Sequence, residues 1–344
     1  MKIQPSHKRG FFNLGPMRFI YLGLLFIALH SCTDNILETV NYGHAQGTTY
    51  SIRYIQDVKN DYQKSIDSIL INIDRSMSLW VESSIISKVN RGDSAIELDP
   101  HFVKVLKRSI KIGQETNGSF DVTVAPLVKA WGFNNGKFQQ LDSAVVDSMK
   151  NLVGFQQILL SGNQVELKQN QQLDFNAIAQ GYSVDVISLF LESEGINNYM
   201  VEVGGELRTK GKNREGNVWR IGIDKPQAEL DSKNRFQIVL NLSGKALATS
   251  GNYRKFFTDE KGMKYVHTIN PKSGYPVKSN LLSATIISDN CMDADAYATT
   301  CMVDGVRKAQ QLIEGQESLE GYLIYSDSKG ELKEWFSSNF DQFK

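Results

Sequence analysis

The chain has 344 residues, of which 41% are hydrophobic and 22% are charged. This composition belongs to a globular protein with enough apolar material for a sizeable core, so it excludes a disordered chain. Lys plus Arg and Asp plus Glu both number 38, and a net charge of zero gives no support to a general nucleic-acid-binding surface. The cysteines at 32, 291 and 301 are too few and too badly spaced for a zinc site or a disulfide framework.

The first 31 residues have the composition of a targeting segment. They contain four basic residues and no acidic one, and an apolar stretch runs from Phe19 to Leu29. Because a helix needs about 20 residues to span a bilayer, this stretch is too short for a transmembrane segment and is typical of a secretory signal. It ends in Leu29-His30-Ser31-Cys32, which resembles the lipobox of bacterial lipoproteins.

We therefore expect residues 1–31 to be a lipoprotein signal peptide and Cys32 to carry a lipid that anchors the exported protein on the periplasmic side of a bacterial membrane. An ordinary signal peptide followed by an incidental cysteine is the alternative. Met17 is a second possible start, because the segment after it is a complete signal by itself. Without its first 31 residues, the remaining domain, residues 32–344, has a net charge of −4.

Apolar periodicity and turn residues predict the first elements of the mature chain. Helical spacing predicts a surface helix between Asp61 and Trp80. A second helix is expected to open at Asp99-Pro100, where an N-cap residue precedes a proline in the first turn. Two short runs, Gln156–Leu160 and Gln164–Lys168, flank a Ser-Gly-Asn turn and predict a β-hairpin.

The second half of the chain predicts a mixture of helices and strands. One helix is expected from about Gln180 to Glu194, with its end at Gly195, and another from about Ala294 to Ile313. Strands are expected at Tyr199–Val203, Trp219–Ile223, Phe236–Leu242, Leu281–Ile287 and Tyr322–Tyr325. Because these elements do not alternate regularly, the sequence predicts an α+β fold and not a doubly wound one.

Asp295 and Thr299 form the first candidate site. They are four residues apart near the start of a predicted helix, so their oxygen atoms lie on one face. A carboxylate and a hydroxyl are hard ligands that suit Mg²⁺. The alternative is that the aspartate near the helix start is an ordinary cap.

His267 is the second candidate. It follows a β-like run and precedes a turn rich in proline and glycine, and histidine can act as an acid or a base near neutral pH. A structural histidine is the alternative. The Gly204-Gly205 turn lacks the spacing of a dinucleotide fingerprint or a P-loop. Cys291 and Cys301 are expected to be buried free thiols.

Eight segments occur in an order that carries more information than any one of them. They are Gln46-Gly47-Thr48-Thr49-Tyr50; Met77-Ser78-Leu79-Trp80 with Ser87-Lys88-Val89-Asn90; the run from Gly118 to Leu127; the run from Leu173 to Tyr182; Val203-Gly204-Gly205-Glu206-Leu207-Arg208; Thr249-Ser250-Gly251; His267-Thr268-Ile269-Asn270-Pro271; and Ala294-Asp295-Ala296. In this order they resemble the ApbE family of FAD:protein FMN transferases, over nearly all of residues 32–344.

The resemblance implies an α+β fold of mixed sheets with flanking helices, related to the T-fold, and a Mg²⁺-dependent enzyme. Such enzymes bind FAD, attach FMN through a phosphoester to a Thr or Ser of a partner flavoprotein, and release AMP. The family's acceptors are flavin-bearing subunits of membrane redox complexes.

Family roles are carried onto matching positions. Asp295 and Thr299 would hold the metal by their side chains, with a backbone carbonyl near Ala177 as the third ligand, and His267 would lie beside the pyrophosphate as the base. The residues implied to line the FAD site are Gln46, Trp80, Ser119, Phe120, Asp121, Asp174, Gln180 and Ile269.

The chain departs from the family at two of these positions. Gln180 stands where many members have Lys or Glu, and Gln46 stands where Met is frequent, so both can hydrogen-bond but neither supplies charge. Two other functions remain open from the sequence. One is an FAD pyrophosphatase that uses water as the nucleophile, and the other is a non-catalytic FAD-binding lipoprotein.

Overall fold

The computed structural model describes Met1 and residues 37–344, apart from residues 94–95, 134–137, 227–234, 252–255, 259–263 and 267. The chain divides into two units, Met1–Ile36 and Leu37–Lys344. The predicted signal peptide and the predicted lipidation at Cys32 lie outside the described residues and stay predictions. Among the described residues, no helix is long and apolar enough to cross a membrane.

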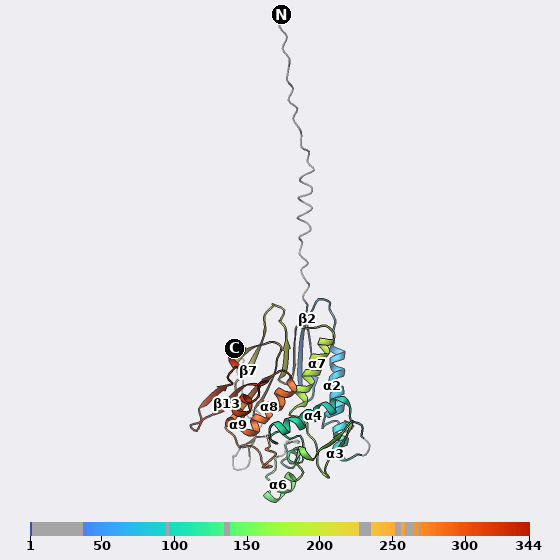
Figure 1. The fold of residues 1–344 in the computed structure, drawn as a ribbon, viewed down its shortest axis with the longest axis vertical. Coiled ribbons are helices and arrows are strands. Elements are labelled where there is room, and N and C mark those ends of the chain that lie inside the picture. Colours follow the sequence, from blue (N-terminus) through green and yellow to red (C-terminus); the bar gives the residue numbers. More distant parts are fainter. Residues whose placement is uncertain are drawn as a thin grey trace. The chain divides into compact units, whose positions relative to one another are not determined.

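One large antiparallel sheet organises the second unit (Figure 1). Its strand order is β1-β2-β5-β6-β9-β12-β13-β14, and each recorded pair of neighbours is antiparallel. These strands are β1 (Leu37–Ala45), β2 (Thr48–Gln56), β5 (Tyr199–Val203), β6 (Glu206–Lys210), β9 (Ala246–Gly251), β12 (Leu281–Ser288), β13 (Glu320–Ser326) and β14 (Leu332–Phe336). Three separate two-stranded pairs are β3 (Leu159–Ser161) with β4 (Gln164–Glu166), β7 (Trp219–Asp224) with β8 (Phe236–Leu242), and β10 (Phe256–Thr258) with β11 (Lys264–Val266).

Helices occur at each predicted place, and further short helices at 85–91, 125–130 and 143–150 were not predicted. The helices are α2 (Gln63–Met77), α3 (Ile85–Arg91), α4 (Pro100–Glu115), α5 (Ala125–Ala130), α6 (Ser143–Lys150), α7 (Ala179–Ser193), α8 (Cys291–Asp304) and α9 (Val306–Glu314), with 3₁₀ turns η1 (Phe155–Gln157) and η2 (Phe340–Phe343). At the start of α4, the Asp99 carboxylate accepts the backbone N–H of Phe102 (2.8 Å) and Pro100 takes the first turn. The predicted opening at Asp99-Pro100 is therefore confirmed.

The prediction of one helix from about Ala294 to Ile313 is wrong. Gly305, at a φ of +76°, separates α8 from α9, and a left-handed or extended glycine interrupts helical backbone. The sequence pattern concealed this break, because apolar residues continue at helical spacing in α9, where Ala309 and Ile313 are buried.

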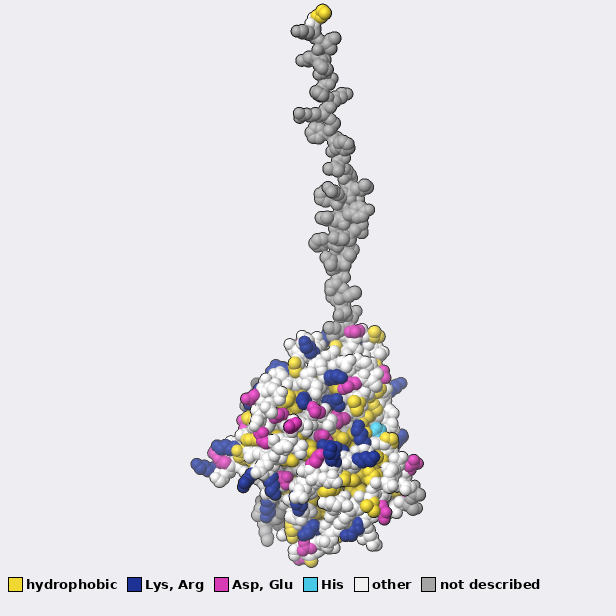
Figure 2. All heavy atoms as spheres, in the orientation of Figure 1, with side chains coloured by type: hydrophobic (Ala, Val, Ile, Leu, Met, Phe, Trp, Pro, Cys, Tyr) yellow, Lys and Arg dark blue, Asp and Glu magenta, His cyan; other side chains and the backbone are white. Residues whose placement is uncertain are grey.

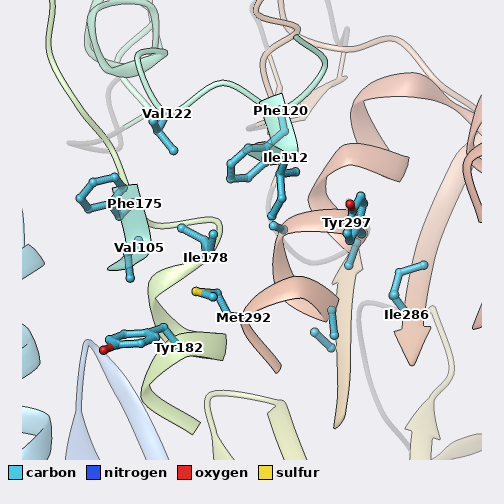
Figure 3. Packing of buried hydrophobic residues seen from close by; sticks show 14 of the residues in the cluster. Val105, Ile112, Phe120, Val122, Phe175, Ile178, Tyr182, Ile286, Met292 and Tyr297 are labelled. Carbon is cyan, nitrogen blue, oxygen red and sulfur yellow. The ribbon is translucent and has the colours of Figure 1, made fainter. Parts of the chain in front are cut away.

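The large sheet separates two apolar layers. Strand residues alternate between its faces, so Ile286 belongs to the cluster that includes α8, whereas its neighbour Ile287 packs with the β7–β8 pair and η2. Helices α7 and α8 cover the first face, with α7 against β5 and β6 and α8 against β9 and β12. Figure 3 shows the core on this side, where Met292 of α8 lies near Tyr182 of α7. This α+β architecture confirms the predicted fold class.

Candidate active site

Asp295 lies where α7 and α8 meet. It stands in the second turn of α8 and is only 6% exposed. Its Oδ2 atom accepts the backbone N–H of Gly181 in the first turn of α7 (3.1 Å). A β-carbon on Gly181 would lie 2.3 Å from the carbonyl oxygen of Cys291, so this close approach of the two helices requires glycine. Asp295 therefore does not cap its own helix, and that alternative is wrong.

Burial sets the protonation of this carboxylate. It raises the pKa of Asp295 to about 7, and the hydrogen bond from Gly181 opposes part of that rise. Near neutral pH the group is therefore poised between its protonated and ionised forms. A cation bound to it would stabilise the ionised form, which is the behaviour expected of a metal ligand that has only a neutral partner.

Two further oxygen atoms were predicted as ligands of the same ion. Thr299 lies one turn beyond Asp295 on the same face of α8, and its hydroxyl forms a hydrogen bond with that of Ser250 in β9 (3.2 Å). The carbonyl of Ala177, in the turn before α7, receives no hydrogen bond from the described residues. A carboxylate, a hydroxyl and a carbonyl are oxygen ligands of the kind that Mg²⁺ takes, and it keeps its other positions for water or phosphate. The residues present fit that ion.

The described cysteines do not add to this candidate ligand set. Within the described part of the chain, no three His, Cys, Asp or Glu side chains gather as a possible metal site. Cys291 and Cys301 are both buried free thiols, as predicted, and burial raises the pKa of each. A protonated, buried thiol is a poor metal ligand and a poor nucleophile.

Gln46 and Gln180 both lie close to the start of α7. Gln46 occupies the turn between β1 and β2, and its Nε2 donates to the hydroxyl of Ser183 in α7 (2.7 Å), while its Oε1 is buried without a hydrogen-bond partner. Gln180 belongs to the first turn of α7, and its Nε2 lies against the backbone of Gly204, where a β-carbon would approach it to 2.9 Å. The structure thus brings these two predicted residues to the same helix end as the Asp295 contact.

Ser119 lies toward the opposite end of α8. Its hydroxyl donates to the carboxylate of Asp304, the last residue of α8 (2.6 Å), and accepts from the ammonium group of Lys272 (3.1 Å). Ser119 and Asp295 are therefore held near the two ends of one helix. An extended ligand that reached both would run along α8.

The side chains of Phe120 and Asp121 are buried and make contacts within the protein. Figure 3 shows the ring of Phe120 beside Ile112, and the ring is buried in the core. The carboxylate of Asp121 accepts three hydrogen bonds, from the N–H and hydroxyl of Thr123 (2.8 and 2.6 Å) and from the N–H of Phe155 (3.0 Å). Contact between a ligand and the side chains of Phe120 or Asp121 stays a prediction.

The other predicted FAD contacts are more widely distributed. Ile269 is buried beside Leu127 and Trp131. Asp174 is half-buried, and its carboxylate accepts the N–H of Asn176 (2.7 Å). The side chain of Trp80 is 72% exposed after the end of α2. His267 follows β11 but lies outside the described residues.

Lys272 and Ser250 are polar residues whose side chains were given no role from the sequence. Each touches a predicted site residue, Lys272 at Ser119 and Ser250 at Thr299. Ser250 belongs to one segment of the ordered pattern, and Lys272 directly follows another. Their closeness to these segments is the one sequence feature that could have pointed to them. Their contacts join residues more than forty positions apart, which no local pattern reveals.

The chain is similar in sequence to one family of proteins. The ApbE family model matches residues 46–323. A protein of Vibrio cholerae named FAD:protein FMN transferase is 35% identical over 313 residues, which cover 88% of this chain and 91% of that protein. One of Haemophilus influenzae with the same name is 34% identical and covers 91% of this chain and 95% of its own length.

Solved structures share the fold. The flavin transferase ApbE from Vibrio cholerae matches with a TM-score of 0.80 and 33% identity, over 90% of this chain and 100% of that one. The apo form of the flavinyl transferase ApbE from Pseudomonas stutzeri has a TM-score of 0.81 and 26% identity, over 89% and 96% of the two chains. With the family model covering most of the sequence, the chain belongs to the ApbE family.

Proposed function

We propose that this chain is a Mg²⁺-dependent FAD:protein FMN transferase. It takes FAD, attaches FMN through a phosphoester to a Thr or Ser of a partner flavoprotein, and releases AMP. The observation that carries the proposal is the buried Asp295 carboxylate, with the Thr299 hydroxyl one turn away, in a member of a family whose curated relatives bear the name of this activity.

Asp295, Thr299 and the carbonyl of Ala177 would hold the ion. When bound, Mg²⁺ supplies positive charge to the oxygen atoms of the pyrophosphate. A local cation matters here because residues 32–344 carry a net charge of −4, so the chain has no bulk attraction for an anionic substrate. Gln46 and Gln180 can add neutral hydrogen bonds, and the exposed indole of Trp80 can stack on a flavin ring.

The transfer exchanges one phosphorus–oxygen bond for another. The oxygen of the acceptor hydroxyl bonds to the phosphorus of the FMN half, and the bond from that phosphorus to the bridging oxygen breaks. The bridging oxygen leaves with AMP. The hydroxyl is a weak nucleophile at neutral pH, so its proton must pass to a base, for which we propose His267.

Incubation of the full chain with FAD, Mg²⁺ and a candidate acceptor domain tests the proposal. Mass spectrometry is expected to find FMN covalently attached to a Thr or Ser of the acceptor, in equal amount to the AMP released. Free FMN and AMP with an unmodified true acceptor would indicate a pyrophosphatase instead. FAD that survives intact would indicate a binding protein.

His267→Ala is expected to slow transfer by about 10²–10⁴-fold, because general-base assistance is of that size. FAD affinity, measured by flavin fluorescence, is expected to be largely kept. A variant that transfers at the normal rate but binds FAD weakly would assign His267 to binding.

The cellular setting is also proposed. A lipid on Cys32 would hold the enzyme at the periplasmic surface of a bacterial membrane, within reach of flavin-bearing subunits of membrane redox complexes. Incorporation of a labelled fatty acid by the full chain, and its loss in Cys32→Ser, tests the anchor. Membrane fractionation of both chains tests the location.

A further inference from the structure

Near the N-terminal ends of α7 and α8, an aspartate of each helix accepts backbone N–H groups of the other helix. Asp295 of α8 accepts the N–H of Gly181 in α7. In the other direction, Asp185 of α7 accepts the N–H of Cys291 through Oδ1 and that of Met292 through Oδ2, both at 2.9 Å. The first N–H groups of a helix lack acceptors within it, so each helix satisfies part of the other's requirement.

The four positions form a closed contact. Gly181 and Asp185 are one turn apart on α7, and Cys291 and Asp295 are one turn apart on α8, so both pairs lie on facing sides of their helices. Gly181 meets Asp295 while Asp185 meets Cys291. Because Gly181 leaves no room for a β-carbon, the two helices approach closely here, and a larger side chain at this position would force them apart.

Asp185 is itself held from the sheet. It is 5% exposed, and the guanidinium of Arg208 in β6 approaches its Oδ1 atom at 3.2 Å. Arg208 also lies 3.6 Å from Glu192, which pairs with Lys210 (3.1 Å). A buried carboxylate that accepts from two amides and a guanidinium has both of its oxygen atoms engaged, so it cannot rotate freely.

The start of α8 does not depend on Asp185 for its ordinary cap. Asn290 is the N-cap residue, and its side chain accepts the N–H of Asp293 (2.9 Å). The Asp293 carboxylate is bound by Arg108 of α4 through two hydrogen bonds (2.6 and 3.1 Å). Asp185 therefore adds something different, which is a fixed placement of α8 against α7.

We infer that Asp185 is a positioning residue for the Mg²⁺ site: by holding the first residues of α8 against α7, it places the carboxylate of Asp295 where the ion binds. The inference rests on the proposed function for the identity of the ion. Groups that orient a metal ligand commonly change metal affinity by about 10–100-fold when they are altered.

Asp185→Asn is the direct test. An asparagine keeps the shape but presents an NH₂ donor to one of the two amides, so one hydrogen bond becomes a clash between donors. We expect the apparent Mg²⁺ affinity of the full chain, measured by calorimetry, to fall by about 10–100-fold. FAD affinity without Mg²⁺ is expected to stay unchanged, and saturating Mg²⁺ is expected to restore most of the transfer rate, which a general loss of structure would not allow.

Glu192→Gln is the matched control. It alters the outer part of the same charge network without touching α8, so its Mg²⁺ affinity is expected to equal that of the unaltered chain. If Asp185→Asn fails to fold, Arg208→Gln, which keeps the carboxylate and removes the charge that orients it, is expected to weaken Mg²⁺ binding in the same direction.

Unaltered Mg²⁺ affinity in a folded Asp185→Asn variant, or in Arg208→Gln where the first does not fold, overturns the inference. The same loss of affinity in Glu192→Gln also overturns it, because the effect would then be one of general stability. A chain that binds Mg²⁺ with this dependence on Asp185 but transfers no FMN to a true acceptor would overturn the proposed function and leave the inference in place.

Discussion

Two buried aspartates differ in how many hydrogen bonds their carboxylates already accept. Asp121 lies in the loop after α4, and Asp295 lies at the α7–α8 junction. Asp121, in the loop, accepts three hydrogen bonds from its own neighbourhood. Asp295, at the junction, accepts one amide and has a pKa of about 7 because of its burial. Both positions are implied to belong to the site by family resemblance. The difference in donors indicates that Asp295 has the capacity to hold a cation, whereas the oxygen atoms of Asp121 are already used.

The largest expected effect is at Asp295. Asp295→Asn removes the charged ligand but keeps an oxygen that can accept the Gly181 amide, so transfer is expected to fall by about 10³-fold or more. The same substitution is not expected to lower the stability of the fold. The folded-state pKa lies above the ordinary value of 3.8, so ionised Asp295 destabilises the fold above neutral pH when Mg²⁺ is absent.

Thermal unfolding of Asp295→Asn without Mg²⁺ at pH 8 is therefore expected at a temperature no lower than that of the unaltered chain. Transfer rates from the same preparations provide the comparison. A folded Asp295→Asn variant with normal Mg²⁺-dependent turnover would remove Asp295 from the metal site.

Gly181→Ala tests the closeness of the two helices. The added β-carbon would meet the Cys291 carbonyl at 2.3 Å and the β-carbon of Asp295 at 2.8 Å, so the helices must move apart. We expect a loss of about 1–3 kcal/mol in the free energy of unfolding, measured with urea, together with weaker Mg²⁺ binding. Normal affinity in this variant would show that the junction tolerates a shift without harm to the site.

The pH dependence of Mg²⁺ binding provides a smaller effect on the same group. Protons compete with the cation for Asp295, so apparent affinity is expected to be constant well above pH 7 and to fall by about tenfold for each pH unit below it. Calorimetry between pH 5.5 and about 8.5 would follow this. Affinity that stays level through pH 6 would mean that another ligand dominates.

Asp121→Asn is expected to change activity least. Its amide NH₂ would face at least one of the N–H donors of Thr123 or Phe155, and an unsatisfied buried donor costs about 1–3 kcal/mol of stability. Because three hydrogen bonds hold the Asp121 carboxylate in its loop, we expect this position to line the FAD site without a contact through its side chain, so the transfer rate per folded molecule and the FAD affinity are expected to stay normal. A selective loss of FAD affinity in the folded variant would make the two aspartates alike and give Asp121 a binding role.

Helices and strands with strong local sequence signals could be predicted, and those without them could not. The opening of α4 was predictable because Asp99, Pro100 and a helical run of apolar residues agree there. Strand β1 was missed, since it is an edge strand with one fully buried residue and so has little apolar alternation. The split between α8 and α9 depends on the backbone angle of a single glycine.

In the candidate site, too, some residues could be predicted from local spacing and others could not. Asp295 and Thr299 could be singled out because their spacing places two oxygen ligands on one helix face. The contacts of Asp295 with Gly181, and of Asp185 with Cys291, join residues more than 100 positions apart. Such pairs depend on how the sheet brings two helices together, and a single sequence holds no local record of that.

The strand order has a consequence for synthesis. In the large sheet the numbers rise steadily from β1 to β14, so each new strand pairs with one that precedes it in the chain. A chain that emerges N-terminus first can therefore extend this sheet at one growing edge, without waiting for a later strand to fill a gap. The junction of α7 and α8 would then close only after β12 has been added, because α8 follows β12 in the chain, so the proposed metal site would be one of the last parts of the protein to form.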